Sequence, residues 1–335
     1  NSGEEFMKRL ISGVKPTGEF TLGNYIGAIR QFVEMQSNYE SFVFVADLHA
    51  LTIYNDPTEL HNRIRELVGI YLACGLDPKY TTLFIQSENL YHANLSWVLE
   101  CNSYMGEMSR MTQFKDKSKN KGNDSISVGL FTYPDLMASD IILYDADVVP
   151  VGIDQKQHVE LARNLVERFN HKYGDTFKVP EPIVPEAGAK IYDLQNPTKK
   201  MSKSDESGKG CIMLLESPES AKKKIMSAVT DSDNKIYYDP DNKPGISNLL
   251  VIYSSLERVS IEEVVKKFEN SNYGEFKREV ADSVANFLTN LQAKYEEIVS
   301  GDLIDKILDE SNEKVRKLAE VKIKEVFKKI GVGRY

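Results

Sequence analysis

Short apolar runs alternate with amphipathic stretches through residues 7–214, and no other feature of the sequence restricts the fold as strongly. The runs have the length of buried strands and lie at residues 8–14, 42–46, 81–85, 148–151 and 183–184. Between them apolar side chains recur at helical spacing, as in the series Leu60, Ile64, Leu67, Val68 and Tyr71. Strands that alternate with helices predict an α/β domain built on a parallel sheet.

Beyond about residue 215 the strand signals stop and helical periodicity dominates. Helices are predicted to begin near Pro218, Ile246, Ile261, Tyr273 and Leu303. We therefore divide the chain into an α/β domain at 7–214, an all-helical domain at 215–300 and a final helix within 301–335. Residues 94–145 are predicted to form a helical insertion in the α/β domain, with a helix over 94–114 and a polar loop over 115–127. Residues 1–6 precede Met7, a plausible start methionine, and we interpret them as a remnant of cloning.

Polar residues follow several of the predicted strands, where parallel sheets bind their ligands. After the first strand come Lys15, Pro16 and Thr17, and after the second come Asp47 and His49. The fourth strand is followed by Gly152, Ile153, Asp154 and Gln155 at a helix start, where backbone N–H groups accept ribose hydroxyls or anions. A P-loop is excluded because Glu19 and Phe20 follow the glycines, and no G-x-G-x-x-G supports a dinucleotide fold.

The segment 196–205 is a poor helix or strand, because it contains a proline and several Ser and Asp residues. Three lysines, Lys199, Lys200 and Lys203, fall within five positions of it. We predict an exposed loop whose ammonium groups hold a polyphosphate and which closes only when one is present. The alternative for an arbitrary lysine-rich segment is a solvated basic loop.

The stretch 130–144 is predicted to be a helix with Tyr133, Met137 and Asp140 on one face. An acid between two apolar residues on an inward face has two interpretations. It is either a buried acid bonded to the backbone, or part of the wall of a pocket for an aromatic ligand that carries an N–H. His49 is likewise either a structural histidine or a residue near the substrate.

Two motifs together resemble the paired signatures of the class I aminoacyl-tRNA synthetases. Thr21-Leu22-Gly23-Asn24 is similar to the His-Ile-Gly-His element, and Lys200-Met201-Ser202-Lys203-Ser204 matches the Lys-Met-Ser-Lys-Ser element without a change. They occur in the family's order and are about 180 residues apart. Residues 227–232 and 243–250 further resemble the bacterial type of tryptophanyl-tRNA synthetase. The resemblance runs from about Met7 to the C-terminus and implies a Rossmann-like catalytic domain.

The resemblance implies that L-tryptophan and ATP form tryptophanyl-adenylate and pyrophosphate, after which tryptophan passes to tRNA(Trp). Lys200 and Lys203 would stabilise the charge on the leaving pyrophosphate, with Lys117 assisting and Mg²⁺ shared with the phosphates. The implied ATP-binding residues are Lys15, Pro16, Thr17, Gly23, Asn24, Gly152, Ile153, Asp154, Ile191, Lys200, Met201, Ser202, Lys203 and Ser204. The implied tryptophan-binding residues are Asp140, Tyr133, Met137, Gln155 and His49. Lys15 departs from the family, in which many bacterial members have Gln, and adds a cation near ATP.

The family also implies a homodimer with residues 94–145 in its interface, an anticodon-binding role for 215–300, and a last helix within 301–335 that packs back on the catalytic domain. Trp97, the only tryptophan, is expected in the core or in a subunit interface. Neither a membrane nor DNA is expected as a partner, because no apolar run is long enough to span a bilayer and the net charge is −8. Cys74, Cys101 and Cys211 lie far apart and the histidines do not cluster with them, which predicts a reducing cytoplasm and no protein-held metal.

Three alternatives compete with this interpretation. A tyrosyl-tRNA synthetase shares the fold, but the run Ala228-Val229-Thr230-Asp231-Ser232 is against it. A non-catalytic RNA-binding paralogue would have no need to retain Lys200 and Lys203. A small adenylyltransferase shares the phosphate motifs but would leave the helical half without a role.

Overall fold

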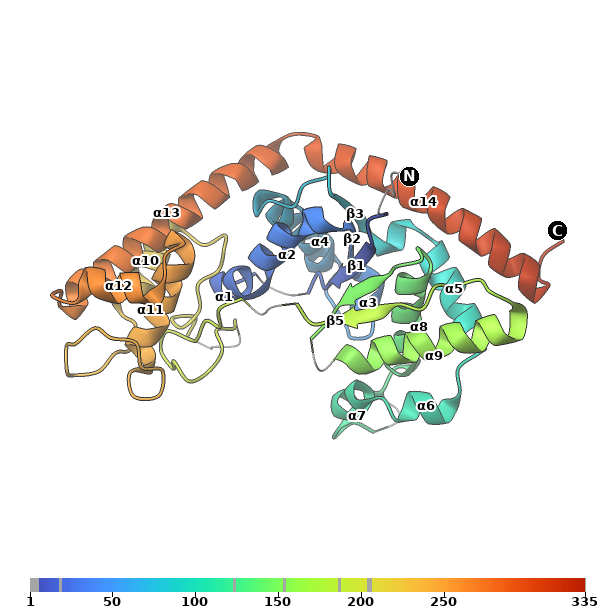
Figure 1. Ribbon diagram of the computed structural model, residues 1–335, viewed down its shortest axis with the longest axis horizontal. Coiled ribbons are helices and arrows are strands. Elements are labelled where there is room, and N and C mark those ends of the chain that lie inside the picture. Colours follow the sequence, from blue (N-terminus) through green and yellow to red (C-terminus); the bar gives the residue numbers. More distant parts are fainter. Residues whose placement is uncertain are drawn as a thin grey trace, which may run out of the picture.

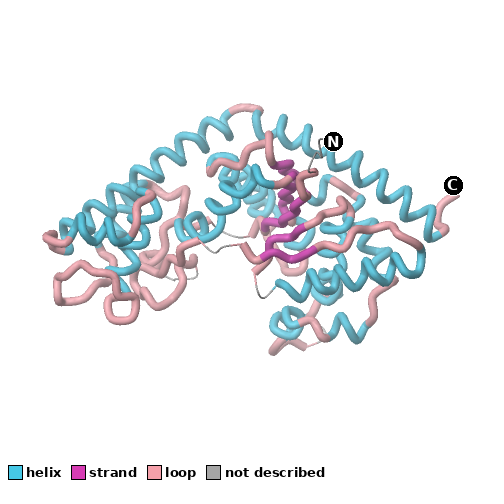
Figure 2. The backbone as a smooth tube through the Cα atoms, viewed as in Figure 1, coloured by secondary structure: helices cyan, strands magenta, loops and turns pink. Residues whose placement is uncertain are grey.

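A five-stranded parallel sheet forms the centre of the computed structural model, which describes residues 6–17, 20–122, 125–152, 155–185, 188–203 and 207–334. Figure 2 shows the strands side by side in the middle of the molecule. Their order is β3-β2-β1-β4-β5. The strands are β1 Arg9–Val14, β2 Glu40–Val45, β3 Thr81–Ile85, β4 Val148–Pro150 and β5 Glu181–Ile183. The predicted parallel α/β sheet is therefore confirmed.

The direction of winding reverses at β1, which lies between β2 and β4. Ile11 of β1 is paired with Phe42 of β2, and Leu10 is paired with Val148 of β4. The chain first adds strands on one side of β1 and later on the other, so the loops after β1 and β4 diverge. A crevice at the carboxyl ends of these two strands is the expected ligand site of such a sheet.

Both faces of the sheet are covered, as the apolar character of β2 requires. Phe42 and Phe44 point to one side and join a core with helices α5, α8, α9 and the later part of α14. Val43 and Val45 point to the other side and pack with α4 and the start of α14. The helices of this half are α1 Leu22–Asn24, α2 Arg30–Met35, α3 Asp47–Ala50, α4 Pro57–Ala73, α5 Tyr91–Glu100, α6 Met105–Ser109, α7 Thr112–Ser118, α8 Val128–Ile142 and α9 Lys156–Tyr173.

The region after β3 differs from the prediction in two ways. The continuous helix expected from 94 to 114 is three helices, α5, α6 and α7, because Tyr104 starts a new helix by capping it together with Glu107. The polar segment 115–127 was expected to be a loop, but its first four residues continue α7. Lysine, serine and aspartate on the exposed side of a short helix give no apolar periodicity by which to recognise it.

Trp97 is not a core residue, since 67% of it is exposed. The buried face of α5 is made by Leu95, Val98 and Leu99, and Trp97 points away from them. Of the two positions expected for this tryptophan, the core and a subunit interface, the single chain therefore excludes the core.

The C-terminal part is all-helical, as predicted, with α10 Pro218–Met226, α11 Pro244–Glu257, α12 Ile261–Phe268, α13 Tyr273–Ser300 and α14 Leu303–Ile330. Figure 1 shows α13 and α14 as one long arch that passes from the helical part over the sheet. Val315 and Ile323 of α14 belong to the core of the α/β part. Lys314 Nζ bonds Thr82 Oγ1 of β3 at 3.1 Å. The final helix therefore packs on the α/β part.

A buried lysine fixes the loop before α11. Lys243 is 2% exposed, and its ammonium group contacts Asp231 at 3.1 Å, Asp233 at 2.5 Å and Tyr273 Oη at 2.8 Å. Burial alone would lower the pKa of Lys243, but the hydrogen bonds to Asp233, Tyr273 and Asp231 raise it. The ion pairs, together with the hydrogen bond to Tyr273, therefore join the loop that begins near Ala228 to the starts of α11 and α13.

Replacing Asp135 with Asn should stabilise the protein at pH 8 but not at pH 4. Asp135 of α8 is 1% exposed, and burial raises its pKa to about 6. The pKa of Asp135 is higher in the folded protein than in the unfolded chain, so the fold favours the neutral acid. The free energy of unfolding therefore falls as the pH rises through about 6. Asn cannot ionise and can still accept the bond from Ser103 Oγ. We expect a gain on the order of 1–3 kcal/mol at pH 8.

Thermal unfolding of Asp135→Asn and wild type at both pH values measures this difference. An equal difference in Tm at pH 4 and pH 8 would contradict the explanation, because it would show that ionisation of Asp135 does not destabilise the fold.

Candidate active site

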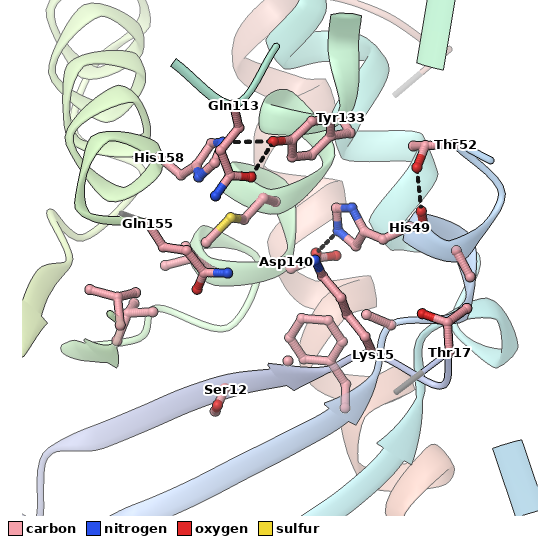
Figure 3. A pocket seen from close by; sticks show the side chains of 18 of the residues that line it. Ser12, Lys15, Thr17, His49, Thr52, Gln113, Tyr133, Asp140, Gln155 and His158 are labelled. Carbon is pink, nitrogen blue, oxygen red and sulfur yellow. Dashed lines mark hydrogen bonds and ion pairs between the residues drawn. The ribbon is translucent and has the colours of Figure 1, made fainter. Parts of the chain in front are cut away.

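A cavity of about 420 Å³ lies at the reversal point of the sheet, beyond β1 and β4. Its lining comes from the ends of these strands, from α3 after β2, and from helices α7, α8 and α9. Figure 3 shows side chains from these separate segments pointing into one space. Of the residues predicted from the sequence, the cavity brings together Lys15, Thr17, His49, Lys117, Tyr133, Met137, Asp140 and Gln155.

Asp140 lies at the inner end of the cavity and is completely buried. Its Oδ2 is 2.7 Å from His49 Nε2. Its Oδ1 accepts a hydrogen bond from Gln86 Nε2 at 2.8 Å and lies 2.7 Å from His92 Nδ1. Burial alone would raise the pKa of Asp140, but the charge and hydrogen bond of His49 and the hydrogen bond of His92 lower it. Asp140 is therefore an ionised acceptor in the wall of the cavity.

His49 forms the edge of the cavity next to this acid. It lies on the short helix α3, directly after β2, and its side chain is 14% exposed. The helix is fixed by Gln86, whose Oε1 accepts from the backbone N–H of Leu48 at 3.1 Å. The sequence rule that places polar residues after strands thus located His49, and the structure places it against Asp140.

Tyr133, about two turns before Asp140 on α8, belongs to a second polar group that lines the cavity (Figure 3). Its hydroxyl lies 2.7 Å from Gln113 Oε1 and 3.0 Å from His158 Nε2. Burial raises the pKa of Tyr133 to about 12, so the phenol stays protonated. Gln155 lies just before α9 and faces the same space. These neutral donors and acceptors can orient a polar ligand head group.

Three lysines line the cavity and make one part of it strongly cationic. Lys15 follows β1, Lys117 lies on α7, and Lys121 follows that helix. Burial, and to a smaller extent the nearby charge of Lys15, lowers the pKa of Lys117. Lys117 Nζ also lies 5.0 Å from the centre of the Tyr133 ring. Ammonium groups that destabilise one another across a cavity are stabilised by an anionic ligand.

The two signature motifs are in direct contact although they lie far apart in the sequence. Thr21 caps α1, with Asn24 N bonding Thr21 Oγ1 and Thr21 N bonding Asn24 Oδ1, both at 3.1 Å. A Cβ on Gly23 would lie 3.3 Å from Met201 Cβ, closer than most side chains tolerate. Glycine at this position therefore lets the first motif pack against residues 196–205, which we call the lysine segment.

The lysine segment is held by the helical part. Asn248 of α11 bonds the backbone N–H and C=O of Tyr192 at 2.9 and 3.0 Å. Met201 is buried and its N–H bonds Ile191 O at 3.0 Å. Lys200 and Lys203 are exposed. None of the described residues that line the cavity belongs to this segment.

Several predicted ATP residues are therefore not in the cavity wall. Pro16, Gly23, Asn24, Gly152, Ile191, Met201 and Ser202 lie outside the cavity lining, and Ile191 is 2% exposed. The predictions for Ile153, Asp154 and Ser204 fall outside the described residues.

The sequence missed five residues of the site, which are Gln86, His92, Gln113, Lys121 and His158. Gln86 directly follows β3, so the rule that located His49 could have found it. His158 of α9 lies three residues after Gln155, which directly precedes the helix, and helical spacing places the two side chains on the same side. No sequence signal identifies Gln113 or His92, because their role depends on how α7 and α5 pack against α8.

The described part of the chain contains no group of three His, Cys, Asp or Glu residues that could hold a metal ion. Apart from Asp140, the polar side chains around the cavity are lysines, histidines, amides and hydroxyls, which suit a polyphosphate better than a metal held by the protein alone. Within the same residues, no helix is both long and apolar enough to cross a membrane.

Comparisons with known proteins agree over most of the chain. A family model described as tRNA synthetases class I (W and Y) matches residues 6–289. The tryptophan–tRNA ligase of Bacillus subtilis is 52% identical over 98% of this chain and 99% of its own length. That of Caldanaerobacter subterraneus is 51% identical over 97% of this chain and 99% of its own length.

Solved structures show the same similarity. A crystal structure of tryptophanyl-tRNA synthetase from Campylobacter jejuni, complexed with ADP and tryptophan, has a TM-score of 0.83 and 32% identity over 97% of this chain and 100% of that one. A tyrosyl-tRNA synthetase from Archaeoglobus fulgidus, complexed with L-tyrosine, is more distant, with a TM-score of 0.61 and 20% identity over 87% of this chain and 91% of that one. This second likeness concerns the fold alone.

Proposed function

Because the chain belongs to the class I tRNA synthetases for tryptophan and tyrosine, we propose that it activates L-tryptophan with ATP and transfers it to tRNA(Trp). The observation that carries this assignment is an ionised, acceptor-only carboxylate, Asp140, inside an apolar cavity that also receives three lysines. An indole ring has one polar atom, an N–H that can only donate. The carboxylate and the lysines match the two ends of a complex between tryptophan and ATP.

The amino acid occupies the inner part of the cavity, with its indole beside Met137 and its N–H directed to Asp140. His49 lies at the edge of this part, close to the indole. Tyr133 and Gln155 hold the ammonium group, with Gln113 and His158 fixing the orientation of Tyr133. This arrangement leaves the tryptophan carboxylate toward the lysines, where ATP binds.

In the first step an oxygen of the tryptophan carboxylate attacks the α-phosphorus of ATP. A bond from the carboxylate oxygen to phosphorus forms, the bond from phosphorus to the oxygen that bridges to the β-phosphate breaks, and pyrophosphate leaves with the electron pair. Positioning and stabilisation of charge account for most of the catalysis in such reactions. Lys200 and Lys203 stabilise the leaving pyrophosphate after their loop closes over it, and Lys117 assists from the cavity.

ATP lies across the carboxyl ends of β1 and β4. Lys15, Pro16, Thr17 and Asn24 contact its phosphates, and Gly23 allows the lysine segment to approach. Gly152, Ile153 and Asp154 hold the ribose, Ile191 the adenine, and Met201, Ser202 and Ser204 complete the phosphate side. Mg²⁺ enters with the ATP phosphates as part of the substrate, since the described residues offer it no cluster of their own.

In the second step a hydroxyl of the terminal ribose of tRNA(Trp) attacks the carbonyl carbon of the adenylate. The new ester forms, the bond from the carbonyl carbon to the phosphate oxygen breaks, the hydroxyl proton passes to a phosphate oxygen, and AMP leaves. We propose that residues 215–300 bind the anticodon and that the reaction takes place in the cytoplasm, with neither a membrane nor DNA as a partner. The tyrosyl alternative is not favoured, because the relatives with about half their residues identical are tryptophan–tRNA ligases.

Acylation of a tRNA(Trp) transcript with labelled tryptophan tests the proposal. The protein should charge tRNA(Trp) in the presence of ATP and should leave a tRNA(Tyr) transcript uncharged with either amino acid. A protein that binds both transcripts but charges neither would support the non-catalytic alternative instead.

We further propose a homodimer whose interface contains the surface around Trp97. Trp97 and Leu51 are 67% and 65% exposed, and both line a surface hollow of about 440 Å³ between α3, α5 and α8. Exposed apolar side chains that gather in one place mark an interaction surface, and a symmetric second copy of the chain would cover Trp97 and Leu51. The homodimer is also expected from the family.

Light scattering should give twice the 38.0 kDa of one chain at micromolar concentration. Trp97→Glu should reduce the mass to that of the monomer, because it places a charge in an apolar interface. Val321→Glu is the matched control, since Val321 is exposed to a similar degree, at 71%, but lies on α14. A wild-type mass of one chain, or equal behaviour of the two variants, would contradict this interface.

A further inference from the structure

A buried chain of hydrogen bonds reaches Asp140 from the side opposite the cavity. Asn89 Nδ2 lies 2.8 Å from Tyr144 Oη, Tyr144 Oη lies 2.6 Å from His92 Nε2, and His92 Nδ1 lies 2.7 Å from Asp140 Oδ1. All four residues are at most 2% exposed. Neither Asn89, Tyr144 nor His92 lines the cavity. These three residues therefore cannot touch the substrate and act only through Asp140.

The donor and the acceptor of each hydrogen bond in this series follow from Asn89, its first member. Asn89 Oδ1 accepts from the N–H of Tyr91, so the amide nitrogen faces Tyr144 and must donate to its oxygen. Burial raises the pKa of Tyr144 well above its usual range, so the phenol keeps its proton. That proton has His92 Nε2 as its acceptor. An Nε2 that accepts leaves the proton of a neutral imidazole on Nδ1, which donates to Asp140.

The two oxygens of Asp140 consequently have different tasks. Oδ1 accepts from Gln86 and His92, both of which are completely buried behind the cavity wall. Oδ2 has His49 as its partner, and His49 belongs to the cavity lining. A carboxylate oxygen can accept more than one hydrogen bond, so Oδ2 can also accept from a donor inside the cavity.

We propose that His92, kept in its Nδ1–H form by Tyr144, is a positioning residue that fixes Asp140 so that Oδ2 receives the indole N–H of tryptophan. The inference rests on the function proposed above. A neutral donor holds the carboxylate without adding a second buried charge, which would cost far more than a neutral group. Ser139 Oγ donates to the backbone carbonyl of His92 at 2.6 Å and keeps the imidazole in register with α8.

The test uses Tyr144→Phe, which removes one oxygen and keeps the ring. Without the phenol, His92 Nε2 loses the donor that holds the imidazole ring in place, so the ring and the Asp140 carboxylate bonded to it lose their fixed orientation. In amino-acid-dependent pyrophosphate exchange the KM for tryptophan should rise about tenfold, the size expected for one lost buried hydrogen bond. The kcat and the KM for ATP should stay within about twofold of the wild type, because the phosphate side is unchanged.

A tryptophan analogue separates positioning from a general loss of structure. In 3-(benzothiophen-3-yl)alanine a sulfur replaces the indole N–H, so the analogue makes no bond to Asp140. Tyr144→Phe should leave the KM for this analogue at its wild-type value. A rise of the same size for tryptophan and the analogue would overturn the proposal, since it would show that the variant only loosens the pocket.

Two replacements of His92 provide a second test of the proposal. The Nδ2 of an asparagine can take the place of the imidazole Nδ1 and donate to Asp140, so His92→Asn should retain most of the affinity for tryptophan. His92→Leu has no donor and should match or exceed the effect of Tyr144→Phe. Equal losses in the Asn and Leu variants would overturn the proposal.

Nitrogen NMR of the wild-type protein tests the tautomer directly, even if a variant fails to fold. The ring of His92 should carry a proton on Nδ1 and none on Nε2, and the opposite tautomer would contradict the proposal. If wild type prefers tryptophan to the analogue but Tyr144→Phe retains that preference, the positioning role alone is wrong. If wild type itself shows no preference, the proposed role of Asp140 fails and this inference fails with it.

Discussion

Lys203→Ala should slow formation of the adenylate by roughly a hundredfold or more, the range found when one charge-stabilising donor is lost. In the first step negative charge accumulates on the departing pyrophosphate, and an ammonium group on the lysine segment stabilises it most when the bond to the α-phosphate is breaking. Because the interaction is strongest in the transition state, kcat should fall and the affinity for tryptophan should barely change. Pre-steady-state measurement of adenylate formation gives the rate, and equilibrium dialysis gives the affinity.

Lys209→Ala is the matched control for this variant. Lys209 is also exposed and follows the same segment, but it lies outside the five-residue motif. It should form adenylate at the wild-type rate. If Lys203→Ala activates tryptophan as fast as Lys209→Ala, the lysine segment has been misassigned and the phosphates are held elsewhere.

Asp140→Ala should lower kcat/KM for tryptophan sharply, because the indole N–H then enters an apolar cavity without an acceptor. An unpaired buried polar group costs about 1–3 kcal/mol, and more when it is charged. The same reasoning explains selection among amino acids, since phenylalanine has no donor for Asp140 Oδ2 in the cavity and the hydroxyl of tyrosine would lie in the wrong place. Pyrophosphate exchange measures the change, and the KM for ATP should stay near its wild-type value.

Two variants define the outcome. Asp140→Asn keeps an acceptor oxygen and should lose less activity than Asp140→Ala. Asp135→Asn replaces a second buried acid of α8 that does not line the cavity, so it should discriminate tryptophan from tyrosine as the wild type does. If both Asp140 variants also keep full discrimination, Asp140 is a structural acid and another residue selects the substrate.

The sequence was sufficient for the sheet and for the position of the site. Strands such as 42–46 and 81–85 are continuous apolar runs, which buried parallel strands require, and the structure places them within one or two residues of the prediction. Polar residues at strand ends, such as Lys15 and His49, were expected to meet because parallel strands end at one edge. The cavity lies at this edge, and these two residues line it.

Contacts between helices could not be predicted in the same way. His92 reaches Asp140 only because α5 packs beside α8, and no local pattern in 91–100 encodes that packing. Trp97 shows the reverse case, since an apolar residue among apolar neighbours suggests burial although α5 presents it to the surface. Gly23 and Met201 meet through the fold of the whole chain, and only the resemblance of the two motifs to the class I synthetase signatures suggested that they act together.

Pyrophosphate exchange into ATP, run separately with each of the twenty amino acids, is the most direct test of the claim that this cavity selects tryptophan for activation. Tryptophan should support exchange, and tyrosine and phenylalanine should be disfavoured in kcat/KM by roughly 10⁴, as in sites that pair a buried polar group with the substrate. Exchange supported equally by tyrosine, or by no amino acid at all, would contradict the assignment of Asp140 and the lysines to this reaction.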